Sequence, residues 1–229
     1  MEGPPYFVLQ LKPFDPMARF SASILDAFSG IIGPAVPSKW RDMYYGRTLP
    51  GTIVRPAAQK QHQQRTKLTF TNRFLKPMKG LLMISFRAHG CSGTEFSSAV
   101  AYNMKHAITG SYPAFRIHYN RVLVSRGPLS AAAAASAVMD GRLLRFSWAG
   151  TATGKASAGD SAVLVVFCPD QGFCYHTLAG GNRSDGAGRL DLSQLAGATV
   201  HTWLAFIGHS GDTSQSLYTG QFTVPHGQE

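Results

Sequence analysis

Hydrophobic and polar residues after Pro56 repeat with the period of an α-helix. Apolar side chains recur at helical spacing from Leu68 to Leu82, and Pro56 suits the first turn of a helix. At 100° per residue the apolar positions fall within an arc of about 160°, with cations on the other side. The pattern predicts an amphipathic helix with a cationic outer face. Pro77 predicts a break within it, because proline lacks a backbone N–H.

A second helix is predicted between Ser92 and Gly110. Ser92 and Glu95 have the spacing of a capping box, and the apolar residues that follow keep helical spacing. Gly110 suits the left-handed residue that ends a helix. Beyond it, residues 115–119 alternate between apolar and polar side chains, which predicts a half-buried strand that residues 122–124 continue.

The last hundred residues change to short apolar segments separated by turn residues. Segments of this kind predict an antiparallel β-sandwich. We expect strands at residues 137–139, 142–148, 162–168, 173–178, 189–192, 200–207 and 217–224. Residues 169–172, Pro-Asp-Gln-Gly, predict a hairpin turn, because proline presets the turn and glycine supplies a positive φ.

Several residues in this half follow a recognisable order. Trp148 closes an early strand, and a later run has Leu190, Leu192, Leu195 and Gly197, followed by the alternating Val200, Thr202, Leu204 and Phe206. This order resembles a fibronectin type III or similar immunoglobulin-like domain, although Val200 stands where that family usually has a tyrosine. The predicted fold is therefore an α+β N-terminal module followed by an all-β immunoglobulin-like (fibronectin type III-like) sandwich.

The charge changes along the chain at the same place as the hydrophobic pattern. The net charge of the 229 residues is +10, of which residues 1–126 contribute +12 (17 Lys and Arg against 5 Asp and Glu) and residues 127–229 contribute −2 (5 against 7). The change coincides with the Gly127-Pro128 breaker and an alanine run. We therefore predict a basic α+β module at 17–127 and a sandwich domain at 128–229.

The apolar runs are short and the chain is rich in turn residues. It has 24 glycines, 13 prolines and only 15% charged residues, which favours short strands. Its apolar runs are far below the roughly 20 residues that span a bilayer, and the first residues lack the apolar region of a secretory signal. We expect no membrane span and a location in the cytoplasm or in an assembled particle.

The whole chain also resembles an uncharacterised bacterial family of proteins of about this length and of unknown function. The residues that carry the resemblance are Phe28–Gly33, Trp40-Arg41, Arg47–Pro50, Pro56, Gln59, Arg65, Arg73–Leu75, Pro77, Tyr102-Asn103, Gly110, Tyr112-Pro113, Phe115 and Val122–Leu129. The resemblance implies no activity. Members usually begin about a dozen residues before the first of these motifs, near Met17. Residues 1–16 are then an extension, which we expect to be poorly ordered unless a partner holds it.

Candidate metal and redox chemistry is limited to one set of residues. Cys168, Cys174 and His176 could contribute to a zinc site, but a structural zinc needs about four ligands. A cross-strand disulfide between the two cysteines is an alternative in an oxidising compartment. The simplest interpretation is that both are small apolar residues flanking a hairpin. We predict no metal and no cofactor.

Catalytic motifs are weak in this sequence. His209, Ser210 and Asp212 supply a base, a nucleophile and a carboxylate, but residues so close on a loop rarely face one another. The loop Gly150–Lys155 lacks the spacing of a phosphate-binding loop. We therefore predict that the protein is not an enzyme, which would require a site built from separated residues.

The basic residues are the strongest candidates for binding. Residues 39–87 contain eleven Lys and Arg and a single acid, Asp42. We predict that this region binds an anionic partner through Arg65, Arg73, Lys76, Lys79, Arg41 and Arg47. Our first hypothesis is a non-enzymatic structural or interaction protein that binds other subunits or itself, with a phage-like or other multiprotein assembly as one setting. The alternative is sequence-nonspecific binding of nucleic acid by the basic helix face.

Overall fold

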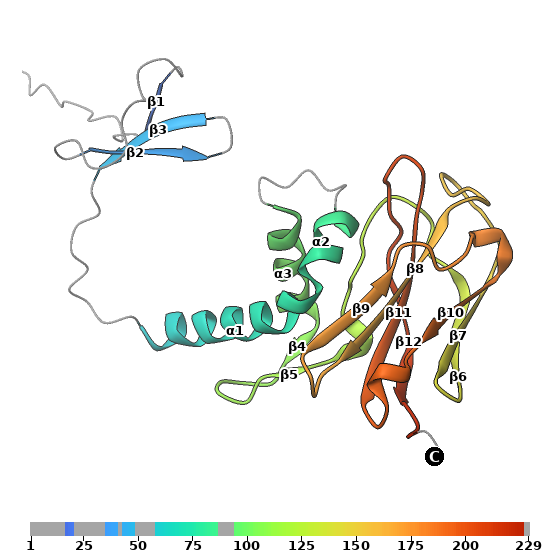
Figure 1. The fold of residues 1–229 in the computed structure, drawn as a ribbon. Coiled ribbons are helices and arrows are strands. Elements are labelled where there is room, and N and C mark those ends of the chain that lie inside the picture. The colour runs from blue at the N-terminus through green and yellow to red at the C-terminus, as the bar shows by residue number, and fades with distance from the viewer. Residues whose placement is uncertain (1–16, 21–34, 41–42, 49–57, 87–93, 227–229) are drawn as a thin grey trace, which may run out of the picture. The chain divides into compact units, whose positions relative to one another are not determined.

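The computed structural model describes residues 17–20, 35–40, 43–48, 58–86 and 94–226, and the chain divides into two compact units, Met1–Pro56 and Ala57–Glu229 (Figure 1). In the first unit three antiparallel strands form a sheet in the order β1-β3-β2. Their bounds are Met17–Phe20 for β1, Ala35–Trp40 for β2 and Met43–Thr48 for β3.

The second unit begins with the predicted amphipathic helix and its break. Helix α1 (Gln59–Leu75) runs into a 3-10 turn, η1 (Lys76–Met78), and then into α2 (Lys79–Ser85). Pro77 lies in the first turn of η1, so the break falls where proline cannot donate an α-helical hydrogen bond. The predicted helix and its interruption are confirmed.

Helix α3 (Glu95–His106) also forms, but both of its predicted caps are wrong. The N-cap is Thr94, whose side chain accepts the hydrogen bond from the Ser97 amide, and Ser92 lies outside the described residues. The helix ends at His106, with Ala107 as its C-cap, before Gly110, because the chain turns there into a short hairpin. Gly110, with φ of +85°, serves the turn between the hairpin strands β4 (Ile108–Thr109) and β5 (Arg116–Ile117).

The strand predicted for residues 115–119 shortens to β5, and a 3-10 turn, η2 (Tyr119–Arg121), follows it. Residues 122–124 are buried but belong to no strand. Their backbone groups bind side chains instead of a neighbouring strand: Asn103 bonds both the amide and the carbonyl of Leu123, and the Val124 amide donates to Ser216 Oγ. Hydrogen bonds to side chains therefore take the place of the strand-to-strand backbone hydrogen bonds that the alternating pattern predicted.

All seven strands predicted for the last hundred residues are confirmed. They form a three-stranded antiparallel sheet, in the order β10-β7-β6, and a four-stranded antiparallel sheet, in the order β12-β11-β8-β9. Their bounds are Ala133–Asp140 (β6), Leu143–Ala149 (β7), Ser161–Cys168 (β8), Phe173–Thr177 (β9), Ala187–Asp191 (β10), Thr199–Ile207 (β11) and Leu217–Thr223 (β12). Two further 3-10 turns are η3 (Arg183–Asp185) and η4 (Ser193–Leu195).

The two sheets bury a common apolar core, so a β-sandwich beside helices is the fold of this unit. Alternate residues of β7 point into the core, and alternate residues of β8 and β11 meet them from the other sheet. This core includes Leu144, Phe146, Trp148, Leu164, Val166, Leu204 and Phe206. The hairpin predicted at residues 169–172 connects β8 to β9, with Gly172 at φ of +60°.

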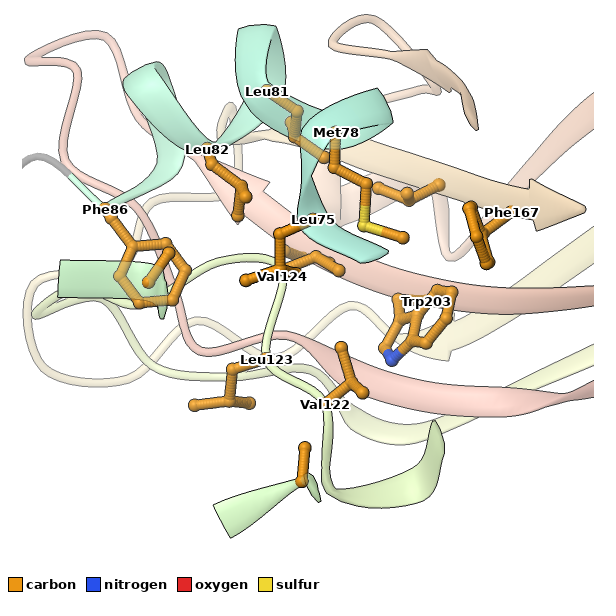
Figure 2. Packing of buried hydrophobic residues seen from close by; sticks show 14 of the residues in the cluster. Leu75, Met78, Leu81, Leu82, Phe86, Val122, Leu123, Val124, Phe167 and Trp203 are labelled. Carbon is orange, nitrogen blue, oxygen red and sulfur yellow. The ribbon is translucent and has the colours of Figure 1, made fainter. Parts of the chain in front are cut away.

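The opposite face of the four-stranded sheet is also buried, because the helices pack against it. Figure 2 shows Leu75 of α1, Met78 of η1 and Leu82 of α2 in one buried cluster that also contains Phe167 of β8 and Trp203 of β11. Because both faces of this sheet are covered, β8 and β11 are buried along nearly their whole length. Residues from both sides of position 128 contribute to this core. The boundary that we predicted at 128, between a basic module and a sandwich domain, stays a prediction.

Candidate docking site on the helices

Four of the predicted cations lie on the continuous helical segment of the second unit. Arg65 and Arg73 belong to α1, Lys76 to η1 and Lys79 to α2, and all four side chains are exposed. Residues 58–86 contain no Asp or Glu, so no acid within the segment offsets their charge. The prediction of a cationic helix surface is therefore supported for these four residues.

These cations also lack carboxylate partners elsewhere in the described part of the chain. Ion pairs among the described residues involve Arg145 with Asp140 and Arg183 with Asp160, both in the sandwich. Lys79 instead places its Nζ 6.0 Å from the centre of the Phe96 ring. The helix surface thus keeps its positive charge available to an external anion.

The first half of α1 contributes charge without burying apolar surface. Thr71 is the first buried residue of the helix, and Leu68, which we predicted to lie within the buried arc, is 42% exposed. That prediction is wrong because the start of α1 extends past the sheet on which its second half packs (Figure 1). Its aromatic contacts are with the β4–β5 hairpin, where the rings of Phe70 and Phe115 lie 6.2 Å apart.

A pocket of about 420 Å³ opens next to Arg73. Its apolar walls come from three places: α1, the segment from β5 to η2, and the end of β8. These wall residues are Phe70, Phe74, Ile117, Tyr119 and Phe167. Arg73 and Asp170, the latter in the β8–β9 turn, supply opposite charges to its lining. The pocket can accept an apolar side chain, and Arg73 can bind an acidic group next to that side chain.

A histidine stacks on one wall of this pocket. The ring of His201, on β11, lies 3.5 Å from that of Tyr119 at an angle of 12°, and its Nδ1 is 2.9 Å from the Tyr218 hydroxyl. Burial lowers the pKa of His201 to about 4, and burial together with the charge of Asp170 raises the pKa of Tyr119. Both rings are therefore uncharged at neutral pH, and the wall they form is apolar.

The other two predicted cations belong to the first unit or lie outside the described residues. Arg47 is exposed on β3, where it pairs with Met17 and Val36 across the sheet. Arg41 lies outside the described residues, as does the proposed extension at residues 1–16. The candidate site described here therefore consists of Arg65, Arg73, Lys76, Lys79 and the neighbouring pocket.

The two described cysteines face opposite sides of the four-stranded sheet. Cys168 points into the core between the sheets, whereas Cys174, opposite Phe167, packs against the core beneath the helices. Both thiols are free, so the disulfide considered above does not form in this structure. Burial raises the pKa of the Cys174 thiol to about 12. Because His176 shares the face of Cys174, Cys168 cannot join these two residues around one ion.

The residues tested as a catalytic group form a local turn. Ser210 Oγ donates to the carboxylate of Asp212 at 3.0 Å, and the Asp212 amide donates back to the same hydroxyl. The serine is therefore bound to the acid and not to His209. This arrangement is the local hydrogen bonding that favours Ser and Asp in turns.

Sequence reasoning missed three residues of the pocket. Tyr119 belongs to η2, whereas Phe167 and Asp170 lie at the end of β8 and in the turn after it, and their meeting with α1 depends on how the helices pack on the sheet. Both Phe70 and Phe74 fall within the apolar arc that predicts core residues; Phe74 is buried, while Phe70 is half-buried, and both line the pocket. The cluster of apolar and charged residues at 167–170 was a usable signal, since it places an acid beside a buried strand end.

No helix in the described residues combines the length and apolar character needed to cross a membrane.

Comparison with known proteins identifies one relationship. No curated protein and no solved structure matches the chain. A family model described as a family of unknown function, DUF6266, matches residues 27–220, which is most of the 229 residues and includes part of the first unit and most of the second. The chain therefore belongs to this family of unknown function.

Proposed function

We propose that this protein is a non-enzymatic interaction protein that binds an acidic protein surface through its helices and presents a β-sandwich. The observation that carries the proposal is the set of four exposed cations on α1, η1 and α2 that lack carboxylate partners among the described residues. The first half of α1 contains no buried residue, so its surface is free to contact another molecule, while the second half packs on the sheet. The other subunits of a multiprotein assembly, phage-like or otherwise, are the partners we propose.

The pocket beside Arg73 favours a protein partner over a purely electrostatic one. Its aromatic walls can bury an apolar anchor, and buried anchors supply much of the energy of protein interfaces. The cations around it would then select partners whose anchor lies next to acidic residues and would increase the association rate. The partner surface that fits this site is acidic, with an aromatic or aliphatic side chain at its centre.

We further propose that the sandwich is of the fibronectin type III kind. Its seven strands divide into a sheet of three and a sheet of four, and the first, second and fifth strands share the smaller sheet. This division is typical of immunoglobulin-like sandwiches with Greek-key connections. In such domains binding residues lie on loops and strand edges, while the core maintains the scaffold.

Sequence-nonspecific binding of nucleic acid is the second candidate. Six Lys and Arg in residues 58–86, without an acid, could neutralise phosphates on one strand or duplex. The half-buried Phe70 next to Arg73 could also stack on a base. This alternative predicts steep salt dependence, whereas a protein partner with a buried anchor predicts binding that persists at higher salt.

Affinity purification from the source cell separates the two candidates. The tagged full-length protein would be recovered at 150 mM salt with and without nuclease, and its partners identified by mass spectrometry. Retention of the same acidic proteins after nuclease treatment is expected. Loss of all bound material with nuclease would instead indicate nucleic acid, and recovery of no partner at all would contradict both candidates.

Matched charge variants assign the binding to the helices. The test variant changes Arg65, Arg73, Lys76 and Lys79 to Gln, and the control changes the exposed sandwich cations Arg142, Arg145, Lys155 and Arg189 to Gln. Both variants lose four positive charges, so a general charge effect would weaken both equally. We expect binding to fall by at least about tenfold in the test variant alone. An additional Phe70→Ala variant tests the pocket, and it should weaken a protein partner without changing the net charge.

A further inference from the structure

The sandwich has a second pocket, far in sequence from the basic helices, with a different chemistry. It has a volume of about 620 Å³ and lies between the edge strand β9 and the segment that follows β10. β9 ends the four-stranded sheet and β10 ends the three-stranded sheet, so the pocket opens at the side of the sandwich where both sheets stop. Its size is within the range of small-molecule sites.

One wall of this pocket is formed by two exposed aromatic rings. Phe173 and Tyr175 are two residues apart on β9 and therefore project from the same face of the strand. They are 49% and 43% exposed, and they belong to the small group of large apolar side chains exposed in the described residues. Paired aromatic rings on an edge strand expose apolar surface that a ligand can cover.

The other wall consists of hydrogen-bonding groups above an apolar floor. Asp191 accepts a hydrogen bond of 2.9 Å from the Ser193 amide and a second from its hydroxyl, which fixes the carboxylate at the end of β10. These hydrogen bonds lower the pKa of Asp191, so it is an anionic acceptor at neutral pH. Gln194 adds an amide that can donate and accept, while the leucines at 192 and 195 are buried beneath.

This combination selects the chemical class of the ligand. Asp191 is the one charged residue among those lining the pocket, so an anion is repelled, and a hydrocarbon would form no hydrogen bond with the second carboxylate oxygen or with the Gln171 and Gln194 amides. A sugar ring fits both walls, because its C–H face can lie on an aromatic ring while its hydroxyl groups bind carboxylate and amide side chains. We propose that this pocket binds a neutral carbohydrate through Phe173, Tyr175 and Asp191.

Affinity electrophoresis of the full-length protein tests this proposal. Native gels would contain one soluble polysaccharide each (xylan, mannan, mixed-linkage β-glucan, dextran or hydroxyethylcellulose), with serum albumin as the reference for unspecific retardation. We expect at least one gel to retard the wild-type protein. The Phe173→Ala and Tyr175→Ala variants should each have an affinity for that polysaccharide that is lower by at least about tenfold. Both positions are exposed, and circular dichroism would verify that the variants fold.

The control variant is Val138→Ala, which removes an exposed apolar side chain on β6, 62% exposed and not part of the pocket. It should be retarded like the wild type. Asp191→Asn, which keeps the shape of the side chain, should weaken binding because an amide accepts from hydroxyl groups less strongly than a carboxylate. Absence of retardation in all five gels would overturn the proposal. Equal retardation of the wild type and the Phe173→Ala/Tyr175→Ala double variant would also overturn it. A phage-display selection in which peptides bind the wild type but not this double variant would overturn it as well, because the ligand would then be a peptide and not a saccharide.

Discussion

A buried ion pair fixes one end of the sandwich, and its removal has a predictable cost. The Nε of Arg183 lies 3.3 Å from Oδ2 of Asp160, with the two side chains 0% and 3% exposed. Arg183 also donates through Nη2 to the carbonyl of Ser130 at 2.9 Å, and its guanidinium carbon lies 3.8 Å from the centre of the Phe206 ring. One residue thus joins the loop after β9, the turn before β8 and the core between the sheets.

Asp160→Asn leaves the guanidinium buried without a countercharge. Breaking a buried pair on one side costs roughly 3–5 kcal/mol, and Arg183→Met should cost a similar amount because it strands the carboxylate. The double variant buries no unpaired charge, so we expect its free energy of unfolding to lie within about 2 kcal/mol of the wild-type value. For a unit of this size, each single change should lower the melting temperature by roughly 6–20 °C.

Urea unfolding followed by tryptophan fluorescence measures the full double-mutant cycle. The control is Asp140→Asn, because Asp140 forms an exposed pair with Arg145 at 2.7 Å, with side chains 58% and 63% exposed. That pair should contribute less than about 1 kcal/mol. The reasoning is refuted if Asp160→Asn is as mild as Asp140→Asn, or if the two changes at Asp160 and Arg183 are simply additive.

Other features of the fold lead to further measurable outcomes. Burial lowers the pKa of His201 to about 4, so as the pH falls the unfolded chain binds a proton at this residue before the folded protein does. The free energy of unfolding should therefore fall by roughly 2–3 kcal/mol as the pH drops from about 6.5 to 4. Urea unfolding at pH 7.5 and 4.5 should show this loss in the wild type and a much smaller one in His201→Gln. Gly127→Ala should destabilise the protein by about 2 kcal/mol or more, because the new methyl group would meet the Thr213 carbonyl, whereas Gly80→Ala, in open space on α2, should stabilise it by about 0.5–1 kcal/mol. Thermal melts of the two variants should shift in opposite directions. The raised pKa of Cys174 predicts that a thiol reagent at pH 8 labels it only in urea, which peptide mass spectrometry can locate; rapid native labelling would contradict this.

The strands were predictable because their signals are local. Turn residues separate the strands, and each strand carries apolar side chains that face the core. Both signals can be recognised within one short segment of the sequence. The burial of β8 and β11 along nearly their whole length has a second cause, which local patterns did not reveal: helices cover the outer face of the four-stranded sheet. Which element covers a given face depends on tertiary packing, and a periodicity cannot specify it.

The candidate site was predictable in its charge and not in its shape. A helical repeat sufficed to place Arg65, Arg73, Lys76 and Lys79 outside the core. The same repeat placed Leu68 inside, because periodicity describes a face of a helix and not the length over which a sheet supports that face. The pocket could not be predicted, since it forms only when residues far apart in sequence meet at one end of the sheet.

The packing of helices on the sheet also determines what kind of docking the cations can support. The rings of Phe74 on α1 and Phe167 on β8 lie 5.3 Å apart, edge to face, so the wall of the pocket joins a helix to a sheet strand. A partner that inserts a side chain there and binds Arg73 contacts both elements at once. Its orientation relative to the sandwich is then fixed without ordering a flexible segment, which reduces the entropic cost of binding. A basic tail of equal charge would attract the same partner but could not hold the sandwich in one orientation. We therefore infer that this charge lies on a packed helix because the function we propose requires a defined direction of presentation.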